Sequence, residues 1–237
     1  MNSAKRDIQT ATTDQEVDAF LRQVAATPTR GSSRGRGRLM FAMDATASRE
    51  PTWDQACQIQ AAMFNETHDL GGLDVQLVFY RGFREFESSP WCGDAAELLD
   101  RMTRVTCAGG ITQIARVLRH AMAETERRRV NALVFVGDCM EESRDELAGL
   151  AGQLGLLGIP VFLFQEGRDP AAEQCFREVA RLSGGAWCPF DAHSPDLLRD
   201  LLSAVAVFAA GGRKALEDFG RRRGGAVRQL THDIGKG

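Results

Sequence analysis

Residues 38–48 read Arg-Leu-Met-Phe-Ala-Met-Asp-Ala-Thr-Ala-Ser, an apolar run that passes directly into polar side chains. A short apolar run such as residues 39–43, with glycine before it and proline after it, predicts a strand buried on both faces. The run ends in Asp44, Thr46 and Ser48. Alternate residues of an extended segment point the same way, so these three oxygens can converge on one point. Hard oxygen ligands suit Mg²⁺, Mn²⁺ or Ca²⁺ better than zinc.

The same residues have a second interpretation that needs no metal. Asp, Thr and Ser are common at helix N-caps and in turns, and Pro51 suits the first turn of a following helix. By itself this segment therefore leaves a metal site and a helix cap as alternatives.

The composition is that of a soluble globular protein. Of the 237 residues, 43% are hydrophobic and 26% are charged, which suits one domain with extensions. No apolar run approaches the roughly 20 residues that cross a bilayer, and the start of the chain has no secretory apolar region. The six cysteines form no Cys-x-x-Cys pair. We therefore expect reduced thiols, a cytoplasmic location and no membrane attachment.

Charge is unevenly distributed along the chain. The net charge is −3, but residues 1–38 carry seven basic and four acidic side chains, and residues 211–237 carry seven and three. The body between them is therefore acidic. A nucleic-acid-binding domain would concentrate positive charge on its folded face, so nucleic acid is not the expected partner. The basic ends are expected to be solvated or to dock on the acidic body.

Apolar runs alternate with segments of helical periodicity, which predicts an α/β fold. Strands alternating with helices of ten or more residues imply a doubly wound, mainly parallel sheet, and a hairpin after the second strand adds one antiparallel edge strand. The predicted strands are 39–43, 75–80, 83–88, 132–136, 159–164 and 184–188, and the predicted helices are 14–26, 52–68, 94–104, 113–128, 143–157, 170–182 and 195–208.

The sequence divides into three regions. Residues 1–37 comprise an N-terminal helix and a linker rich in Gly, Ser and Arg. Residues 38–210 form the folded domain. Residues 211–237 form a basic tail, which we expect to be mobile apart from one short helix near residues 214–220.

Two further elements carry polar residues suited to a metal site. The strand 132–136 is followed by Gly137 and Asp138, and a predicted helix begins behind the segment Gly-Gly-Ile-Thr that ends at Thr112. In a doubly wound sheet the ends of these segments can share one carboxyl edge with Asp44. Three elements in this order, each after the right kind of segment, favour a functional site over a chance arrangement of caps.

The pattern Asp44-x-Thr46-x-Ser48, then Gly-Gly-x-Thr112, then Asp138 resembles the metal-ion-dependent adhesion site (MIDAS) of von Willebrand factor type A (VWA) domains. The resemblance implies a Rossmann-like VWA fold of the bacterial intracellular type. It also implies that Thr46, Ser48 and Thr112 are direct metal ligands, while Asp44 and Asp138 act largely through waters.

This resemblance covers roughly residues 38–208 and departs from the family pattern in small ways. Thr46 stands where serine is usual, and Gly137 and Cys139 flank the later aspartate where the family often has Thr and Gly. Cys139 is a soft thiol beside a hard-ion site, so we expect it to be a bystander.

The implied function is metal-dependent protein binding. Because few of the direct ligands are charged, a bound Mg²⁺ ion (or Mn²⁺ or Ca²⁺) stays strongly electrophilic and keeps an open coordination position. An Asp or Glu of a protein partner can fill that position. Intracellular relatives commonly serve in multiprotein assemblies, often beside ATPases. An ion held this way needs no base or nucleophile beside it, so no catalytic residue is expected.

Two alternatives remain at the level of sequence. Asp44 could serve a Mg²⁺-dependent phosphohydrolase or be a phosphoacceptor, but Thr46 stands where a phosphatase of that kind needs an acid, and the paired acids and strand-end lysine of a phosphoacceptor are missing. Separately, the basic tail, which includes Arg221, Arg222, Arg223 and Arg228, could fold onto the acidic body and regulate the site.

Overall fold

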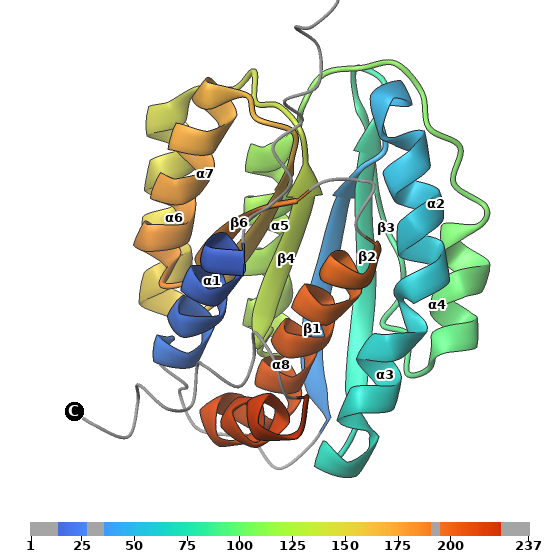
Figure 1. Cartoon of the computed structure of the whole chain (residues 1–237). Coiled ribbons are helices and arrows are strands. Elements are labelled where there is room, and N and C mark those ends of the chain that lie inside the picture. The colour runs from blue at the N-terminus through green and yellow to red at the C-terminus, as the bar shows by residue number, and fades with distance from the viewer. Residues whose placement is uncertain (1–13, 28–35, 191–194, 224–237) are drawn as a thin grey trace, which may run out of the picture.

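Six strands form a single sheet in the order β3-β2-β1-β4-β5-β6 (Figure 1). The structure is a computed structural model that describes residues 14–27, 36–190 and 195–223. All neighbouring strands pair in parallel except β2 and β3, which form an antiparallel pair at one edge. The strands are β1 (Gly37–Asp44), β2 (Leu73–Arg81), β3 (Glu85–Ser88), β4 (Ala132–Gly137), β5 (Val161–Glu166) and β6 (Ala186–Phe190).

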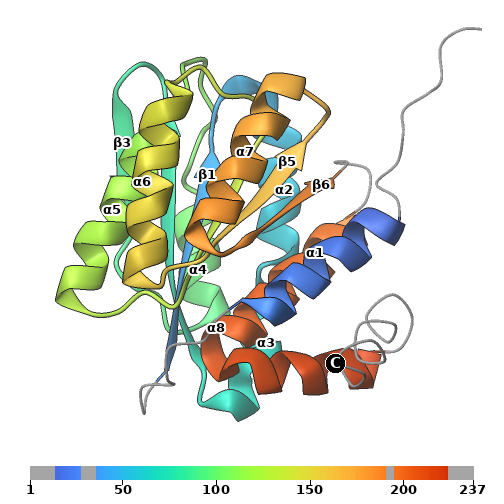
Figure 2. The same ribbon diagram turned by 90° about the vertical axis from the view of Figure 1, so that its left-hand side faces the viewer.

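Helices cover both faces of the sheet, as the two views in Figure 1 and Figure 2 show. One face packs against α1 (Asp14–Ala26), α2 (Glu50–Ile59), α3 (Ala61–Thr67), α4 (Ala95–Met102) and α8 (Pro195–Arg223). The other packs against α5 (Ile114–Arg127), α6 (Arg144–Leu157) and α7 (Pro170–Ser183). Two short 3₁₀ helices, η1 (Ala47–Arg49) and η2 (His68–Leu70), complete the described elements.

Strand β1 lies at the centre of the sheet because it is apolar on both faces. All eight of its residues are buried, and it pairs with β2 on one side and β4 on the other. From β1 the chain moves outward through β2 and β3, then returns to β4 and moves outward the other way. The crevice where strand order reverses, between the carboxyl ends of β1 and β4, is the usual ligand site of doubly wound sheets.

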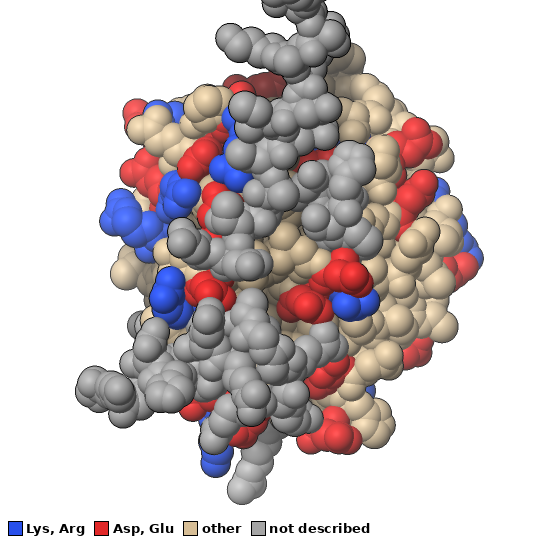
Figure 3. Space-filling model, in the orientation of Figure 1, with Lys and Arg blue, Asp and Glu red and all other residues tan. Residues whose placement is uncertain are grey.

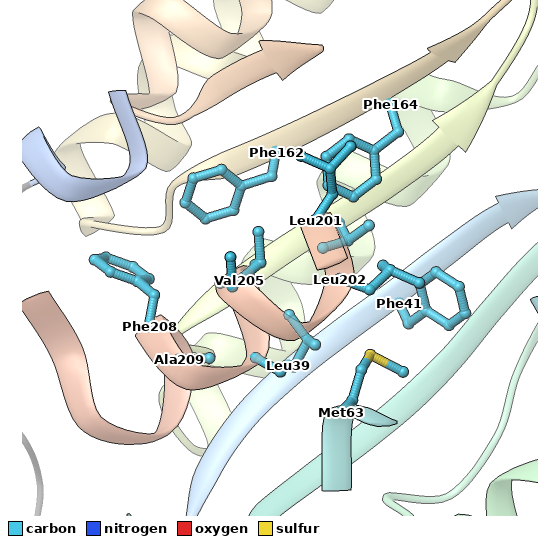
Figure 4. Close-up of a cluster of buried hydrophobic side chains, with 14 of the residues drawn as sticks. Leu39, Phe41, Met63, Phe162, Phe164, Leu201, Leu202, Val205, Phe208 and Ala209 are labelled. Atoms are coloured by element: carbon cyan, nitrogen blue, oxygen red, sulfur yellow. The ribbon is translucent and has the colours of Figure 1, made fainter. Parts of the chain in front are cut away.

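Helix α8 supplies much of the core on its face of the sheet. Leu201, Leu202 and Val205 point toward aromatic and aliphatic side chains of β1 and β5, and α3 contributes Met63 from the side (Figure 4). Phe208 packs edge-on against Phe162 with ring centroids 5.7 Å apart. This packing holds in place the strands β1 and β5, whose carboxyl ends lie at the edge of the sheet where a ligand site is expected.

The predicted fold class is confirmed, since the sheet is doubly wound, mainly parallel and has one antiparallel edge strand. Each predicted strand overlaps an observed one. The single helix predicted over 52–68 is instead two, α2 and α3, which meet at Gln60. Gln60 keeps helical angles and is buried, so the break lies in its hydrogen bonding rather than in a turn residue that sequence could reveal.

The C-terminal boundary differs from the prediction at Ala210. Helix α8 continues to Arg223 through a kink at Gly212, whose φ of 69° only glycine adopts readily. Beyond the kink, Leu216 and Phe219 are buried in the same core. The helix predicted near residues 214–220 is therefore present, but it continues α8 and packs in the core instead of belonging to a mobile tail. Residues 224–237, and residues 28–35 of the predicted linker, lie outside the described residues.

The surface is mixed in charge. On the face seen in Figure 3, acidic and basic side chains are interspersed among uncharged ones over the described residues. In the same part of the chain, no helix has both the length and the apolar character needed to cross a membrane.

Candidate metal centre

Asp44 ends β1 inside the protein, with 1% of its surface exposed. Its Oδ1 accepts a hydrogen bond from the backbone N–H of Thr46 (2.7 Å), and its Oδ2 accepts one from the hydroxyl of Tyr80 (3.3 Å). Burial raises the pKa of the Asp44 carboxyl, the hydrogen bond from Thr46 lowers it, and the negative charge of Asp138 raises it further. A nearby cation would offset the cost of ionising this buried acid.

The residues that follow Asp44 bring their hydroxyls to Asp138. Thr46 Oγ1 lies 3.4 Å from Ser48 Oγ, and Ser48 Oγ donates to Asp138 Oδ2 at 3.1 Å. Asp44, Thr46, Ser48 and Asp138 thus form a hydrogen-bonded chain that joins the carboxyl ends of β1 and β4. Gly137, just before Asp138, also lies close, since a Cβ there would be 3.9 Å from the Asp44 Cβ.

Thr112 is joined to the loop after β4, and its hydrogen bonds go to that loop rather than to Asp44, Thr46, Ser48 or Asp138. Its backbone N–H donates to Glu141 (3.0 Å), and its hydroxyl accepts from the backbone N–H of the same residue (3.1 Å). Glu141 follows Asp138 by three residues, so this reciprocal pair fastens Thr112 to the segment that carries Asp138. Thr112 is buried, at 5% exposure.

Glu142 acts at the start of a helix other than the one that follows it in the sequence. Its carboxylate accepts the backbone N–H groups of Ile114 (2.5 Å) and Ala115 (2.9 Å), the first residues of α5. These groups lack partners inside the helix, and a negative charge at a helix N-terminus is favourable. Glu142 therefore caps α5 across space, whereas the start of α6 is capped by Ser143.

The glycine segment before Thr112 is seated on a neighbouring loop. Ala108 donates its N–H to the carbonyl of Ala45 (3.0 Å), and Ile111 donates to the carbonyl of Gly82 (3.1 Å). A Cβ at Gly110 would lie 2.1 Å from that Gly82 oxygen, so no side chain fits there. Gly109 has open space around it. Gly110 thus allows the loop to approach β2 closely and bring Thr112 to the sheet edge.

Arg49 is a residue that sequence analysis missed. It follows Ser48 directly, yet its side chain is only 2% exposed. Its Nη1 forms an ion pair with Glu166, at the end of β5, and lies 4.0 Å from Asp138 Oδ2. A buried arginine is not suggested by any local pattern, because its partner is more than a hundred residues away in the sequence.

The assembled side chains fit a hard divalent cation. Hydroxyl and carboxylate oxygens are the donors such ions prefer. Asp138 Oδ1 is buried and has no hydrogen-bond partner among the described residues, so it has a free acceptor. No group of three or more His, Cys, Asp and Glu side chains could hold a metal in the described ranges, so any site here depends on the hydroxyls. Burial and the charge of Asp138 raise the pKa of the Cys139 thiol to about 12.

Comparison with known proteins identifies the fold. No protein-family model and no curated protein matches the chain. The VWA domain of SpRpn10 superposes with a TM-score of 0.56 at 15% identity, over 70% of this chain and 94% of that one. A von Willebrand factor type A protein from Catenulispora acidiphila gives 0.56 at 16% identity, over 73% and 43%.

A third solved structure of similar fold is described with a bound metal. Proximal thread matrix protein 1 from the mussel byssus, described with a zinc-occupied MIDAS motif, gives a TM-score of 0.56 at 14% identity, over 73% of this chain and 46% of that one. Similarity at these identities concerns the fold. This chain therefore has the fold of a VWA domain, and the predicted resemblance is confirmed at that level.

Proposed function

We propose that this protein is a divalent-cation-dependent protein-binding module. The observation that carries the proposal is the hydrogen-bonded chain from Asp44 through Thr46 and Ser48 to Asp138, at the point where strand order reverses. In this proposal Thr46, Ser48 and Thr112 supply direct ligands, and the two aspartates hold coordinated waters.

A bound Mg²⁺ would supply a Lewis acid with an open position for a carboxylate. The chain's own residues keep that position available. Asp44 is buried and hydrogen-bonded through both oxygens, which favours its acting through water. Thr46 and Ser48 are partly or fully accessible from outside, so an Asp or Glu of a partner protein can approach them. We place this binding in a cytoplasmic multiprotein assembly of the kind that contains an ATPase.

The geometry disfavours the enzymatic alternative. A phosphohydrolase or phosphoacceptor would need a free carboxylate oxygen of Asp44 in line with a phosphate. Both oxygens of Asp44 are hydrogen-bonded, and 1% of the residue is exposed. We therefore propose that the protein is not an enzyme.

The test is capture of partners from a lysate of the source cells by the tagged full chain, in Mg²⁺ and in EDTA. We expect proteins that are retained in Mg²⁺, released by EDTA and absent when Asp44→Ala is used, with mass spectrometry to identify them. A matching set of proteins on the wild-type and Asp44→Ala chains would contradict the proposal. Hydrolysis of p-nitrophenyl phosphate by the wild-type chain, lost in Asp44→Ala, would instead favour the phosphohydrolase.

A further inference from the structure

Arg49 is the largest fully buried side chain in the described structure, and it lies beside the proposed metal site. It is the N-cap residue of α2, and its guanidinium lies against Asp138 and Glu166, at the ends of β4 and β5. Burying an unpaired charge is costly, so the carboxylates around Arg49 must account for its position.

Three strands bring acidic groups to this one guanidinium. Asp138 follows β4 and lies 4.0 Å away, and Glu166 ends β5 and forms the close ion pair. Asp44 ends β1 at the same edge of the sheet, where burial raises the pKa of its carboxyl and the positive charge of Arg49 offsets part of that rise. The hydroxyl of Thr52 donates to Glu166 and holds the acceptor in place.

The charges in this cluster do not cancel. Asp138 and Glu166 both face one guanidinium, so with both carboxylates ionised the cluster keeps an excess of one negative charge, and ionisation of the buried Asp44 beside a bound cation would add a second. A divalent cation would neutralise that excess. Without Arg49 the excess would be larger, the cation would be held more tightly, and its attraction for an outside carboxylate would be weaker.

We propose that Arg49 is a positioning residue that sets the charge of the metal site. It holds Glu166 to itself and offsets one carboxylate, so that a bound divalent ion keeps its affinity for a carboxylate of a partner. This inference rests on the proposed function. It differs from a purely structural role because it assigns opposite effects to the two members of the ion pair.

The experiment is Mn²⁺ binding to the full chain, followed by the electron paramagnetic resonance signal of free Mn²⁺. Arg49→Met should lower the dissociation constant about tenfold, and Glu166→Gln should raise it about fivefold, because one removes positive and the other negative charge near the ion. The dissociation constant of the double variant should lie within about threefold of the wild-type value. That of Arg49→Lys should also lie within about threefold, because lysine keeps the positive charge.

A matched control tests loss of a buried arginine as such. Arg38 is buried, is paired with Glu124, and lies at the opposite end of β1. Arg38→Met should leave Mn²⁺ affinity unchanged. If Glu166→Gln and Arg49→Met shift the affinity in the same direction in folded protein, the charge role is wrong. If Arg49→Met does not fold, weakening by Glu166→Gln supports the proposal and an unchanged or tighter constant overturns it. If the wild-type chain binds no Mn²⁺, the proposed function itself fails.

Discussion

At the scale of single residues, Asp44 is the group for which folding and metal binding make opposite demands. Burial raises the pKa of its carboxyl, so folding favours the neutral acid over the carboxylate. The contribution of Asp44 to the free energy of unfolding therefore decreases as the pH rises through the raised pKa. We expect Asp44→Asn to melt no lower than the wild type in EDTA at neutral pH. The variant should also lose any rise in melting temperature on adding Mg²⁺, because the carboxylate that favours the cation is gone.

Differential scanning fluorimetry in Mg²⁺ and in EDTA measures both effects. Glu141→Gln is a useful comparison, since it should keep part of the Mg²⁺ response while loosening the hydrogen bond to the N–H of Thr112. An Asp44→Asn chain that is still stabilised by Mg²⁺ to the wild-type extent would show that the ion binds elsewhere.

The sequence was sufficient to predict that Asp44, Thr46, Ser48 and Asp138 come together, but not what surrounds them. Asp44, Thr46 and Ser48 could be predicted because period-two geometry places them on one side of a strand end. Asp138 could be predicted because it ends another buried strand. Arg49 could not be predicted, because its burial depends on Glu166 of β5, a contact between segments far apart in sequence. The roles of Thr46, Ser48 and Thr112 as ligands remain predictions.

At the scale of elements, the loop before α5 makes one especially close backbone approach, at Gly110. Gly110→Ala would place a Cβ 2.1 Å from the carbonyl oxygen of Gly82, so the loop must shift. We expect a loss of stability of about 2 kcal/mol and a reduced Mg²⁺ response, because Thr112 moves with the loop.

Gly109 provides the matched control, because a Cβ there meets nothing within 4 Å. Gly109→Ala should keep both the stability and the Mg²⁺ response of the wild type. Urea denaturation measures the stability of the two variants, Gly110→Ala and Gly109→Ala, and a Mg²⁺ titration measures their response to the ion. Equal effects of the two substitutions would mean that loss of glycine flexibility, rather than the contact with Gly82, explains the result.

Helix α5 also carries a pH-dependent contribution to stability. His120 is half-buried, contacts Gln76 at 3.1 Å and packs edge-on against Phe86. Burial lowers its pKa, the charge of Glu124 raises it, and that of Arg127 lowers it. The folded state therefore disfavours the charged imidazole, so stability is lost as pH falls from about 6.5 through the lowered value.

We expect the urea midpoint to fall between pH 7.5 and pH 5.5, and the fall to be smaller in His120→Gln. The difference between the two chains at the two pH values isolates this residue from the other titrating groups. A fall of the same size in both chains would assign the pH dependence to other residues.

The boundaries of elements were harder to predict than their types. The break between α2 and α3 at Gln60 has no glycine or proline to mark it. The short helix near residues 214–220 was predicted, but its continuity with α8 and its packing were missed for the opposite reason. Two glycines, at 211 and 212, suggested an end, while Leu216 and Phe219 found room in a core that only the assembled helices create.

At the scale of the whole molecule, the second part of α8 belongs to the folded domain. A chain ending at Ala210 would lose the buried side chains of Leu216 and Phe219, so we expect it to be less stable than a chain ending at Arg223 by about 4 kcal/mol. Urea denaturation of the two shortened chains measures this difference. Equal stabilities would show that residues 211–223 pack too loosely to contribute. Any test of regulation by the basic tail should therefore remove only residues after Arg223.

The central claim is that segments from three parts of the chain hold one divalent cation at the carboxyl edge of the sheet. The most direct measurement is a crystal structure of the full chain grown with Mn²⁺, with anomalous difference density at the manganese edge. The account predicts one strong peak within ligand distance of the Thr46 and Ser48 hydroxyls, close to Thr112, Asp44 and Asp138. A peak elsewhere with none at that edge, or no peak at millimolar Mn²⁺, would contradict it.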